Sequence, residues 1–414
     1  MNPFYMVWLS LCVLTALVWM RRHLDLSQAQ RGDDALGPDP CGRAPKTCPS
    51  VSVIVAAKDE ESTIERCVLT LLEQDYPNFR LIVVDDRSSD HTADILDALQ
   101  RRFPDRMRVL HVTKLPDGWF GKTNAVNMGV HTADGDFLLF TDADCEQVSD
   151  RTISTAVRYA LENRIEFLSI LPLIKPHCMW EAFLQPACTG VLMFWHQPDK
   201  VNDPKRPEAY ANGAFMLIDK DAYQRIGGHQ RVRSAICEDM QLARNAKTAG
   251  VKLRVIQGRG LYATRMYNSF HETFCGWTRI LQGSLQWAPK VLLAAALLTV
   301  FSIFPMVSLV AAGVGWAGSS PQASAPWGWI FAASLVSVAA LQSVMARFYG
   351  LLQAPAWRSI FYTPAAVFCL AILMNTLVRV LGVGSTTWRG TVYHRSKAQR
   401  TNPTTIEKPA THTG

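Results

Sequence analysis

The sequence predicts an α/β domain with a mostly parallel sheet, joined to membrane-spanning helices at both ends of the chain. From Val51 onward, short β-branched apolar runs alternate with segments in which apolar residues recur at helical spacing. Long apolar runs precede and follow this region, and about 20 apolar residues match the hydrocarbon thickness of a bilayer. With 49% hydrophobic and 19% charged residues among 414, the composition fits a membrane protein that carries a water-soluble domain.

The N-terminal region predicts a membrane anchor followed by a tether. Residues 1–22 are almost wholly apolar up to Arg21 and Arg22. Because the charges follow the apolar run and no small-residue cleavage site is present, we expect an uncleaved anchor rather than a signal peptide. Basic residues accumulate on the cytoplasmic side of such anchors, which predicts a cytoplasmic location for the domain that follows. Residues 23–50 are polar, contain Gly and Pro, and are typical of a tether without a core of its own.

Residues 51–288 carry the pattern of the sheet domain. Strands are predicted at 51–57, 80–84, 108–112 and 137–140, and helices at 64–72 and 92–101. Continuous β-branched runs such as VSVIVAA are typical of parallel strands that are covered on both faces. Right-handed crossovers should connect these strands, as they do in nucleotide-binding sheets.

Acidic residues follow the strands at their carboxyl ends, where open α/β sheets bind ligands. Asp142 and Asp144 come directly after the run 137–140. If the chain is still extended there, the two carboxylates share a face and can bind one hard cation. The alternative is an acidic loop without a ligand.

A second acidic group is expected beside the first. Asp85 and Asp86 follow the strand at 80–84, and Asp59 and Glu60 follow the strand at 51–57. The alternative for the segment DDRSSD is helix capping, because Ser and Asp satisfy free amides well. Capping and ligand binding are compatible, since different side chains can serve each.

The segment GWFGKTNAVNMG offers groups that suit a phosphate. Gly118 and Gly121 allow close backbone approach, Lys122 carries a positive charge, and a helix is predicted to begin near Thr123. The spacing of a Walker-type phosphate loop and the GxGxxG pattern are both missing, which argues against a mononucleotide kinase or a dehydrogenase.

Two segments of the second half leave alternatives open. Residues 178–197 are rich in Trp, Phe, Met and Leu but contain Pro186 and Glu181. They predict either an interfacial element that lies on the bilayer or a buried amphipathic helix. Glu238 and Asp239 stand at the start of a predicted helix, where capping of the helix dipole alone could explain them.

The motifs VSVIVAAKDEE, VVDDRSS, GKTNAVNMG and FTDADC, in this order, resemble the nucleotide-sugar half of family-2 inverting glycosyltransferases of the GT-A fold. The resemblance implies that Asp142 and Asp144 hold Mg²⁺ or Mn²⁺ on the donor's diphosphate. It implies that Asp239, with Glu238 beside it, is the base that takes the proton of the acceptor hydroxyl. Residues implied to contact the donor nucleotide are Asp59, Glu60, Asp85, Asp86, Lys122, Asn124, Trp277 and Arg279.

The segments ANGAF, GGH, CEDMQLAR, RMY and GWTR resemble membrane-bound glycosyltransferases that act on polyisoprenoid-type lipids, such as carotenoid glucosyltransferases and hopanoid-associated enzymes. Ceramide glucosyltransferases are more distantly similar. The Gln-X-X-Arg-Trp motif of many processive members is missing near Trp277. The resemblance therefore implies transfer of one sugar, from UDP-glucose or UDP-N-acetylglucosamine, to a hydroxyl of a membrane lipid of the polyisoprenoid, carotenoid, hopanoid or sphingolipid type. The alternatives are a processive polysaccharide synthase and a non-catalytic nucleotide-binding membrane scaffold.

The C-terminal region leaves the membrane topology open. Apolar runs near 291–315, 327–345 and 359–383 predict a membrane region over 289–385, followed by a basic tail at 386–414 that we expect to be disordered. Four crossings would place both termini opposite the catalytic domain, yet the basic residues of the tail favour the cytoplasm. These residues are Arg389, Arg395, Lys397 and Arg400. A re-entrant or interfacial run would resolve this conflict, and the sequence leaves that question open.

Charge and cysteine content indicate which partners the protein binds and in which compartment its domain lies. The net charge of +7 is scattered along the chain, which favours anionic headgroups or a nucleotide diphosphate over nucleic acid. The ten cysteines have no zinc-site spacing and are expected as reduced thiols. Together these observations predict a multi-pass protein of the cell (inner) membrane with a cytoplasmic catalytic domain.

Overall fold

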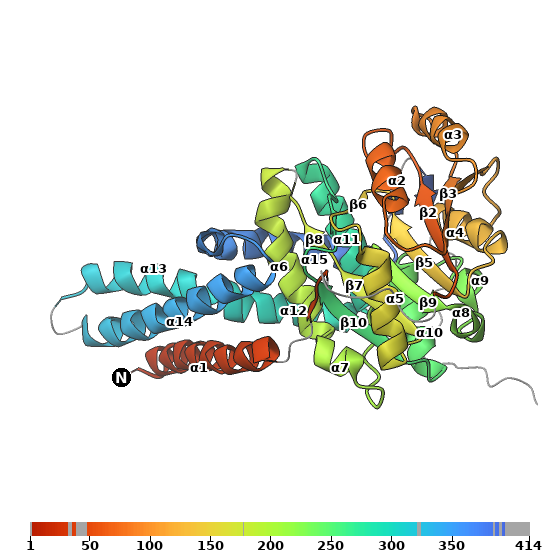
Figure 1. The fold of residues 1–414 in the computed structure, drawn as a ribbon. Coiled ribbons are helices and arrows are strands. Elements are labelled where there is room, and N and C mark those ends of the chain that lie inside the picture. Colours follow the sequence, from red (N-terminus) through yellow and green to blue (C-terminus); the bar gives the residue numbers. More distant parts are fainter. Residues whose placement is uncertain are drawn as a thin grey trace, which may run out of the picture.

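The computed structural model describes residues 2–31, 35–38, 48–176, 178–320, 324–383, 386–388 and 391–393. Its centre is an eight-stranded sheet in the order β1-β10-β7-β9-β5-β2-β3-β4 (Figure 1). The strands are β1 (Ala35–Leu36), β2 (Val51–Ala57), β3 (Phe79–Asp85), β4 (Met107–His111), β5 (Phe137–Asp142), β7 (Phe167–Leu171), β9 (Phe215–Asp219) and β10 (Leu253–Gly258). All pairs are parallel except those of β9, which runs antiparallel to β5 and β7. The predicted, mostly parallel sheet is confirmed.

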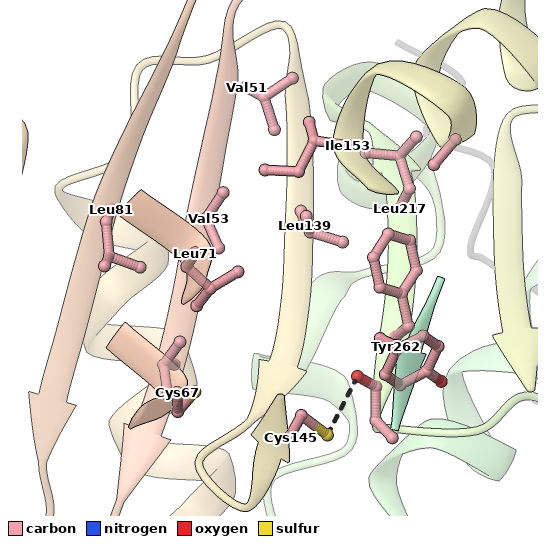
Figure 2. Packing of buried hydrophobic residues seen from close by; sticks show 14 of the residues in the cluster. Val51, Val53, Cys67, Leu71, Leu81, Leu139, Cys145, Ile153, Leu217 and Tyr262 are labelled. Carbon is pink, nitrogen blue, oxygen red and sulfur yellow. Dashed lines mark hydrogen bonds between the residues drawn. The ribbon is translucent and has the colours of Figure 1, made fainter. Parts of the chain in front are cut away.

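Alternate residues of the central strands pack on opposite faces of the sheet, as the pleat requires. Figure 2 shows Val53, Leu81 and Leu139 on one face with Leu71 and Ile153 over them. The last two residues belong to helices α2 (Ile64–Leu72) and α5 (Thr152–Asn163). The opposite face carries the intervening strand residues, Ile54, Ile82, Val84, Leu138 and Phe140. Because both faces are covered, the continuous β-branched runs are explained by burial on each side.

Helix α3 (Thr92–Arg102) packs beside α2 on the first face. Helices on the second face and near the strand ends complete the domain: α4 (Gly121–His131), α7 (Pro198–Asn202), α8 (Lys220–Arg225), α9 (Gly228–Arg231) and α10 (Glu238–Thr248). A three-stranded sheet of β6 (Cys145–Gln147), β11 (Tyr262–Thr264) and β8 (Leu173–Ile174) lies beyond the end of β5. The short antiparallel pair β12 (Thr386–Trp388) and β13 (Thr391–Tyr393) stands at the start of the predicted tail, and residues 394–414 lie outside the described part.

Four apolar segments in the described residues are long enough to cross a membrane: 3–27, 288–317, 324–351 and 356–380. They correspond to α1 (Pro3–Arg31), to α12 (Ala288–Leu298) with the π-helical turn η1 (Thr299–Ile303) and α13 (Phe304–Ala317), to α14 (Ser324–Leu351), and to the 3₁₀ helix η2 (Ala356–Phe361) with α15 (Tyr362–Val380). Figure 1 shows α1, α13 and α14 side by side, projecting together from the sheet domain. The three C-terminal apolar runs that the sequence predicts all fall in these helices.

The polar segment 23–50 has more structure than a simple tether. Helix α1 continues to Arg31, and Ala35 and Leu36 form the edge strand β1, which pairs with β10. Residues 32–34 and 39–47 lie outside the described part. The segment that follows α1 is therefore joined to the sheet by the backbone hydrogen bonds of β1 with β10.

The segment predicted as either interfacial or buried forms helix α6 (Met179–Trp195), which packs against α11 (Phe270–Leu285) and α15. One face is buried, with Leu184 and Cys188 fully inaccessible to solvent, while Met179 at the helix start is 72% exposed. Helices α6 and α11 thus share one apolar cluster with α12, α14 and α15, which are among the helices long enough to cross a membrane. This cluster joins the sheet domain to these helices.

Candidate active site

A cavity of about 1860 Å³ opens at the carboxyl ends of β2 and β5. The register places Ala57 opposite Asp85, and Ala56 opposite Asp142, so these strands end at the same edge. From this edge the cavity continues past α10 and α11 to residues of α6, α14 and α15, including Phe348 and Tyr362. One continuous space therefore connects the strand-end acids with α14 and α15, two of the helices long enough to cross a membrane.

Lys122 lies at the centre of the acidic group. Its Nζ is 2.7 Å from Asp142 Oδ1 and 2.7 Å from Glu238 Oε1. Burial would lower the pKa of Lys122, but Asp142 and Glu238 outweigh burial and hold it well above its usual value. Lys122 comes from the first turn of α4, Asp142 from the end of β5 and Glu238 from the start of α10. The lysine therefore brings acids from the two halves of the domain to one point.

Asp142 and Asp144 lie on either side of the tight turn between β5 and β6. The side chain of Thr264, at the end of β11, hydrogen-bonds to Asp144. Burial, followed by the nearby carboxylates of Asp142 and Glu60, raises the pKa of Asp144 to about 7. A carboxylate crowded by other carboxylates favours a proton or a cation, and the oxygen donors here suit a hard divalent ion.

The protein supplies only part of a metal coordination sphere. Among the described residues, no group of three or more His, Cys, Asp or Glu side chains is arranged to hold a metal ion. A cation bound by Asp142 and Asp144 would need further oxygen ligands from a bound molecule or water, as Mg²⁺ often does with substrate phosphates. The donor set fits a cation shared with a diphosphate.

Glu238 and Asp239 begin α10 and line the cavity, with Glu238 on the same lysine as Asp142 of β5. Burial would raise the pKa of Glu238, but the Lys122 ammonium outweighs burial and lowers it. For Asp239, burial and then the Glu238 carboxylate raise the pKa to about 6. The two adjacent acids thus differ, because only Glu238 pairs directly with the lysine.

Asp239 is held by two backbone amides. Its Oδ2 accepts a hydrogen bond from Gly213 N at 2.9 Å, and its Oδ1 accepts one from Met240 N at 2.7 Å. Asp239 lies in the first turn of α10, where the helix dipole favours an acid, but the N-cap residue Cys237 makes no side-chain capping bond. A Cβ at position 213 would stand 3.2 Å from Lys122 Nζ and 3.4 Å from Asp239 Oδ2. Gly213 therefore allows the lysine and the aspartate to approach the same stretch of backbone.

Asp59 ties the loop after β2 to the loop after β3. Its Oδ1 accepts hydrogen bonds from the amide and hydroxyl of Ser89, at 2.7 and 3.1 Å, and its own amide donates to Ser88 Oγ at 3.0 Å. Asp59 adopts a left-handed backbone conformation with φ of 52°, which Asp tolerates better than most residues. Asp59 and Glu60 both line the cavity.

Asp85 and Asp86 point in different directions. Asp86 is 2% exposed, pairs with Arg87 (Nε to Oδ1, 2.8 Å) and lines the cavity at the start of α4. A Cβ at position 121 would overlap its carboxylate, so Gly121 is required there. Asp85 is not among the described residues that line the cavity. It accepts from Ser88 N at 3.2 Å and contacts His111 Nδ1 at 3.1 Å.

Of the other residues predicted to contact the donor nucleotide, some line the cavity and one does not. Trp277 and Arg279 line the cavity, and the Trp277 Nε1 donates to Gln185 Oε1 at 3.1 Å. Asn124 is buried beside Met128 and does not reach the lining in the described chain. As a nucleotide contact it stays a prediction, as does Asp85.

Sequence reasoning missed the roles of Gly213 and Thr264 and the position of Lys122 between two acids. Thr264 ends a three-residue strand and carries no motif that could have identified it. Gly213 lies in ANGAF, a segment noted only for its resemblance. The lysine was predicted for phosphate, because nothing in the sequence places α10 beside α4.

A mostly parallel sheet, with paired acids after β5 and a second acid pair beside Lys122, is the arrangement that a GT-A resemblance implies. Residues 52–226 match the family model described as Glycosyl transferase family 2, so the chain carries a domain of this family. The resemblance stated from the motifs is confirmed, as is the enzyme class.

Relatives with curated names point the same way. The chain is 26% identical over 258 residues to a 4,4'-diaponeurosporenoate glycosyltransferase of Staphylococcus haemolyticus (strain JCSC1435), covering 61% of this chain and 66% of the relative. It is 26% identical over 268 residues to the protein of the same name in Staphylococcus aureus (strain USA300), covering 63% of this chain and 68% of the relative. The chain thus spans about two thirds of the length of these relatives.

A solved structure supports the fold. The mannosyltransferase of Pyrobaculum calidifontis, in complex with GDP-Man and Mn2+, is similar with a TM-score of 0.51 at 18% identity. The similarity covers 90% of this chain and 99% of that one. At this identity the likeness supports the architecture of the sheet and its helices.

Proposed function

We propose that this protein transfers a single sugar from a nucleotide-sugar donor, UDP-linked, to a hydroxyl of a membrane lipid in a metal-dependent inverting reaction. The observation that carries the proposal is the continuous cavity from Asp142 and Asp239 to Phe348 and Tyr362. A polar donor can occupy the end at the strands while an apolar acceptor enters from the membrane helices. The curated relatives, named for 4,4'-diaponeurosporenoate, favour a lipid of the carotenoid or polyisoprenoid type.

In this proposal Asp142 and Asp144 hold a divalent cation, Mg²⁺ or Mn²⁺, together with the diphosphate. The cation supplies charge stabilisation for the departing nucleoside diphosphate. The raised pKa of Asp144 supports the assignment, because the carboxylates repel one another without a cation between them. The Pyrobaculum mannosyltransferase is in complex with Mn2+ and GDP-Man, so GDP-sugars belong in the test beside UDP-sugars.

Asp239 is the proposed base. As the acceptor oxygen forms its bond to the anomeric carbon, the bond from that carbon to the diphosphate oxygen breaks, and the hydroxyl proton passes to Asp239. A pKa of about 6 suits this task, since the carboxylate is mostly ionised at neutral pH yet accepts a proton readily. Glu238 stays ionised against Lys122 and holds that lysine in place.

The geometry favours catalysis over a non-catalytic scaffold. Burying acids from β5 and α10 beside one lysine costs desolvation energy. A non-catalytic scaffold has no function that would require this arrangement. Asp142 and Glu238 share Lys122, and Asp239 approaches the same lysine beside Gly213. A processive synthase would place a growing polymer in the cavity, and the product analysis below separates that alternative.

The proposed location is the cell membrane, with the sheet domain on the cytoplasmic side. The basic residues Arg21 and Arg22 follow the apolar part of α1 on the side of the sheet domain. Lys290, at the start of α12, lies over the Trp195 ring with 5.8 Å from Nζ to its centroid. Basic and aromatic residues at this level are typical of a headgroup region.

The test is donor turnover by the purified chain in detergent with a mixed lipid extract, using labelled UDP- and GDP-sugars. We expect label in the organic phase, loss of this label with EDTA and its return with Mn²⁺. Asp239→Asn should lower turnover by about 10² to 10⁴-fold. Asp221→Asn is the matched control, because Asp221 is an exposed acid of α8 away from the cavity. Label in a long polymer would contradict single transfer, and nucleotide binding without any transfer would support the scaffold.

A further inference from the structure

Helices α1 and α14 run in the same direction, toward the sheet domain. Cys12 Sγ lies 3.4 Å from Ser334 Oγ, and farther along both helices Arg347 Nη1 donates to His23 O at 3.1 Å. Since α1 leads directly into the strand β1 of the main sheet, its C-terminal end is on the catalytic side. The C-terminal end of α14 is therefore on the catalytic side too.

The helix formed by α12, η1 and α13 runs the opposite way. It follows α11 of the sheet domain, and it meets α1 in reverse order. Trp19 Nε1 donates to Phe301 O at 2.7 Å, whereas Trp8 Nε1 donates to Ser308 Oγ at 2.6 Å. Its 30 residues span about 45 Å at 1.5 Å per residue, more than the ~30 Å of a hydrocarbon core. Ser302 stands near the middle of this helix.

Helix α15 begins beside Ser302 and returns to the sheet domain. At its start, Tyr362 Oη lies 3.0 Å from Ser302 Oγ, and Thr363 Oγ1 donates to Ser302 O at 3.4 Å. Near its end, Asn375 Nδ2 donates to Thr278 Oγ1 at 3.1 Å, on helix α11. Figure 1 places α15 beside α6 and α11, with which it packs. The helix thus runs from mid-depth back to the catalytic side.

From these directions we infer that η2 and α15 form a re-entrant hairpin in the leaflet on the catalytic side, so that the chain crosses the membrane three times. Helix α14 ends on the catalytic side, η2 carries the chain to the depth of Ser302, and α15 brings it back. One face of α15 is packed against protein, with Ala365, Cys369 and Ile372 fully buried. The 3₁₀ helix η2 packs against α14 and α15 with Ser359 buried. The side chains that it exposes include the apolar Trp357, Ile360 and Phe361, which suit lipid, and its helical backbone needs no partner from lipid.

The other face of α15 presents an apolar stripe to the lipid tails of the same leaflet. Val367, Met374 and Val378 are 49%, 38% and 43% exposed and recur at helical spacing. The neighbouring helices also expose apolar side chains, among them Leu292, Val307 and Leu335, which is why we assign lipid rather than protein as the partner of this stripe. The stripe lies on the helix whose first residue lines the catalytic cavity.

Three crossings also remove the conflict between the apolar runs and the basic tail. With α15 returning, the chain after Val380 lies on the side of the sheet domain. The basic residues Arg389, Arg395, Lys397 and Arg400 then share the side of Arg21 and Arg22, as the distribution of positive charge around membrane segments requires. This inference depends on helix directions and holds whether or not the proposed transfer reaction is correct.

The test is labelling of single introduced cysteines in intact cells with a membrane-impermeant maleimide. Val383 is 61% exposed just after α15, and Ser320 is exposed between α13 and α14. The natural Cys275 is exposed on α11 and reports the catalytic side. We expect Ser320→Cys to differ from Cys275 in its labelling, and Val383→Cys to behave as Cys275 does. With a cytoplasmic sheet domain, Ser320→Cys gains a label in intact cells, whereas Val383→Cys gains one only after permeabilisation.

A reporter on the full chain tests the same inference without relying on thiol reactivity. Alkaline phosphatase, active only outside the cytoplasm, is inserted after Ser320 in one variant and fused to Gly414 in another. Activity of the first with inactivity of the second supports three crossings. Activity of both, or labelling of Val383→Cys together with Ser320→Cys, would overturn the re-entrant hairpin and establish four crossings.

Discussion

The acids of the loops after β2 and β3 and the acids around Lys122 lie at the same edge of the sheet but have different partners. Asp59 and Asp90 accept hydrogen bonds from amides and hydroxyls, such as those of Ser89 and Thr92. Burial would raise the pKa of Asp90, yet these bonds outweigh it and lower the pKa. In the second group, burial and neighbouring carboxylates raise the pKa of Asp144 to about 7.

The difference separates acids that organise loops from acids that can react. A carboxylate satisfied by neutral donors stays charged and holds two loops together. A carboxylate that faces other carboxylates gains by binding a proton or a cation, which is what catalysis at neutral pH uses. Asp59 and Asp90 of the first group and Asp142 and Asp144 of the second all follow strands in the sequence, so sequence position alone does not distinguish them.

The largest expected effect concerns the proposed metal acids. Asp142→Asn and Asp144→Asn should each lower kcat by about 10³-fold, because a bound cation supplies several kcal/mol of charge stabilisation and 1.36 kcal/mol corresponds to tenfold. The measurement is transfer at saturating donor over a titration of Mn²⁺. Asp90→Asn, from the loop-organising group, is the control and should retain most activity. Full turnover of Asp142→Asn in EDTA would contradict a metal-binding role for Asp142 and would leave no functional difference between the acids around Lys122 and the loop-organising acids.

The next effect concerns the lysine that joins the acids. Lys122→Met should lower the free energy of unfolding by roughly 1–3 kcal/mol, because it leaves buried Glu238 unpaired. The value is below that for a fully buried pair, since the Lys122 side chain is 31% exposed. Lys175→Met is the control, because Lys175 is 3.9 Å from Glu146 at a more exposed position and such pairs contribute about 0–1 kcal/mol. Equal unfolding midpoints for the two variants would contradict the role of Lys122.

The pH dependence of transfer offers a third comparison. The proposed base acts only as a carboxylate, and the pKa of Asp239 is raised to about 6. The value of kcat/KM should therefore fall as the pH drops through 6, reaching about one tenth at pH 5. A carboxyl with the ordinary pKa would keep its activity down to about pH 4. A fall of kcat/KM only near pH 4 would contradict the raised pKa of Asp239 and group this residue with the loop-organising acids.

The smallest effect is expected within the loop-organising group. Asp59→Asn keeps a side-chain oxygen that can accept the bonds from Ser89, so donor affinity should change by less than about tenfold and stability by about 1 kcal/mol at most. Asp59→Ala, which removes the acceptor, should cost about 1–3 kcal/mol by leaving the Ser89 amide without it. Donor binding by calorimetry and thermal unfolding measure the two quantities. A larger loss for Asn than for Ala would mean that the charge itself is required.

Much of the sheet could be predicted because its signals are local. The predicted strand at 80–84 lies within β3 (Phe79–Asp85), the strand at 108–112 overlaps β4 (Met107–His111), and the helix at 92–101 matches α3. Each depends on apolar residues next to one another in the chain. The antiparallel insertion of β9 between β5 and β7 was not predicted, because strand order depends on pairing between distant segments.

The site was predicted as residue types rather than as an arrangement. Asp142, Asp144, Glu238, Asp239 and Lys122 were each singled out, and all line the cavity. Asp85 was grouped with Asp86 as a neighbour in sequence, but alternate strand residues point to opposite sides, and the two reach different partners. A pair of adjacent acids therefore says little about which one faces a ligand.

The amino-acid sequence by itself determined that this chain forms a mostly parallel sheet and carries helices long and apolar enough to cross a membrane, because both follow from contiguous apolar runs of the right length. Only the tertiary structure decided that Lys122 lies between Asp142 and Glu238, and that Asp239 accepts a hydrogen bond from the amide of Gly213. It also decided the direction of α15, through the contacts of Tyr362 with Ser302 and of Asn375 with Thr278. The hydrophobic effect is non-directional and can be inferred from the apolar residues of each segment. Hydrogen bonds between remote segments require a defined geometry, which exists only once the chain is folded.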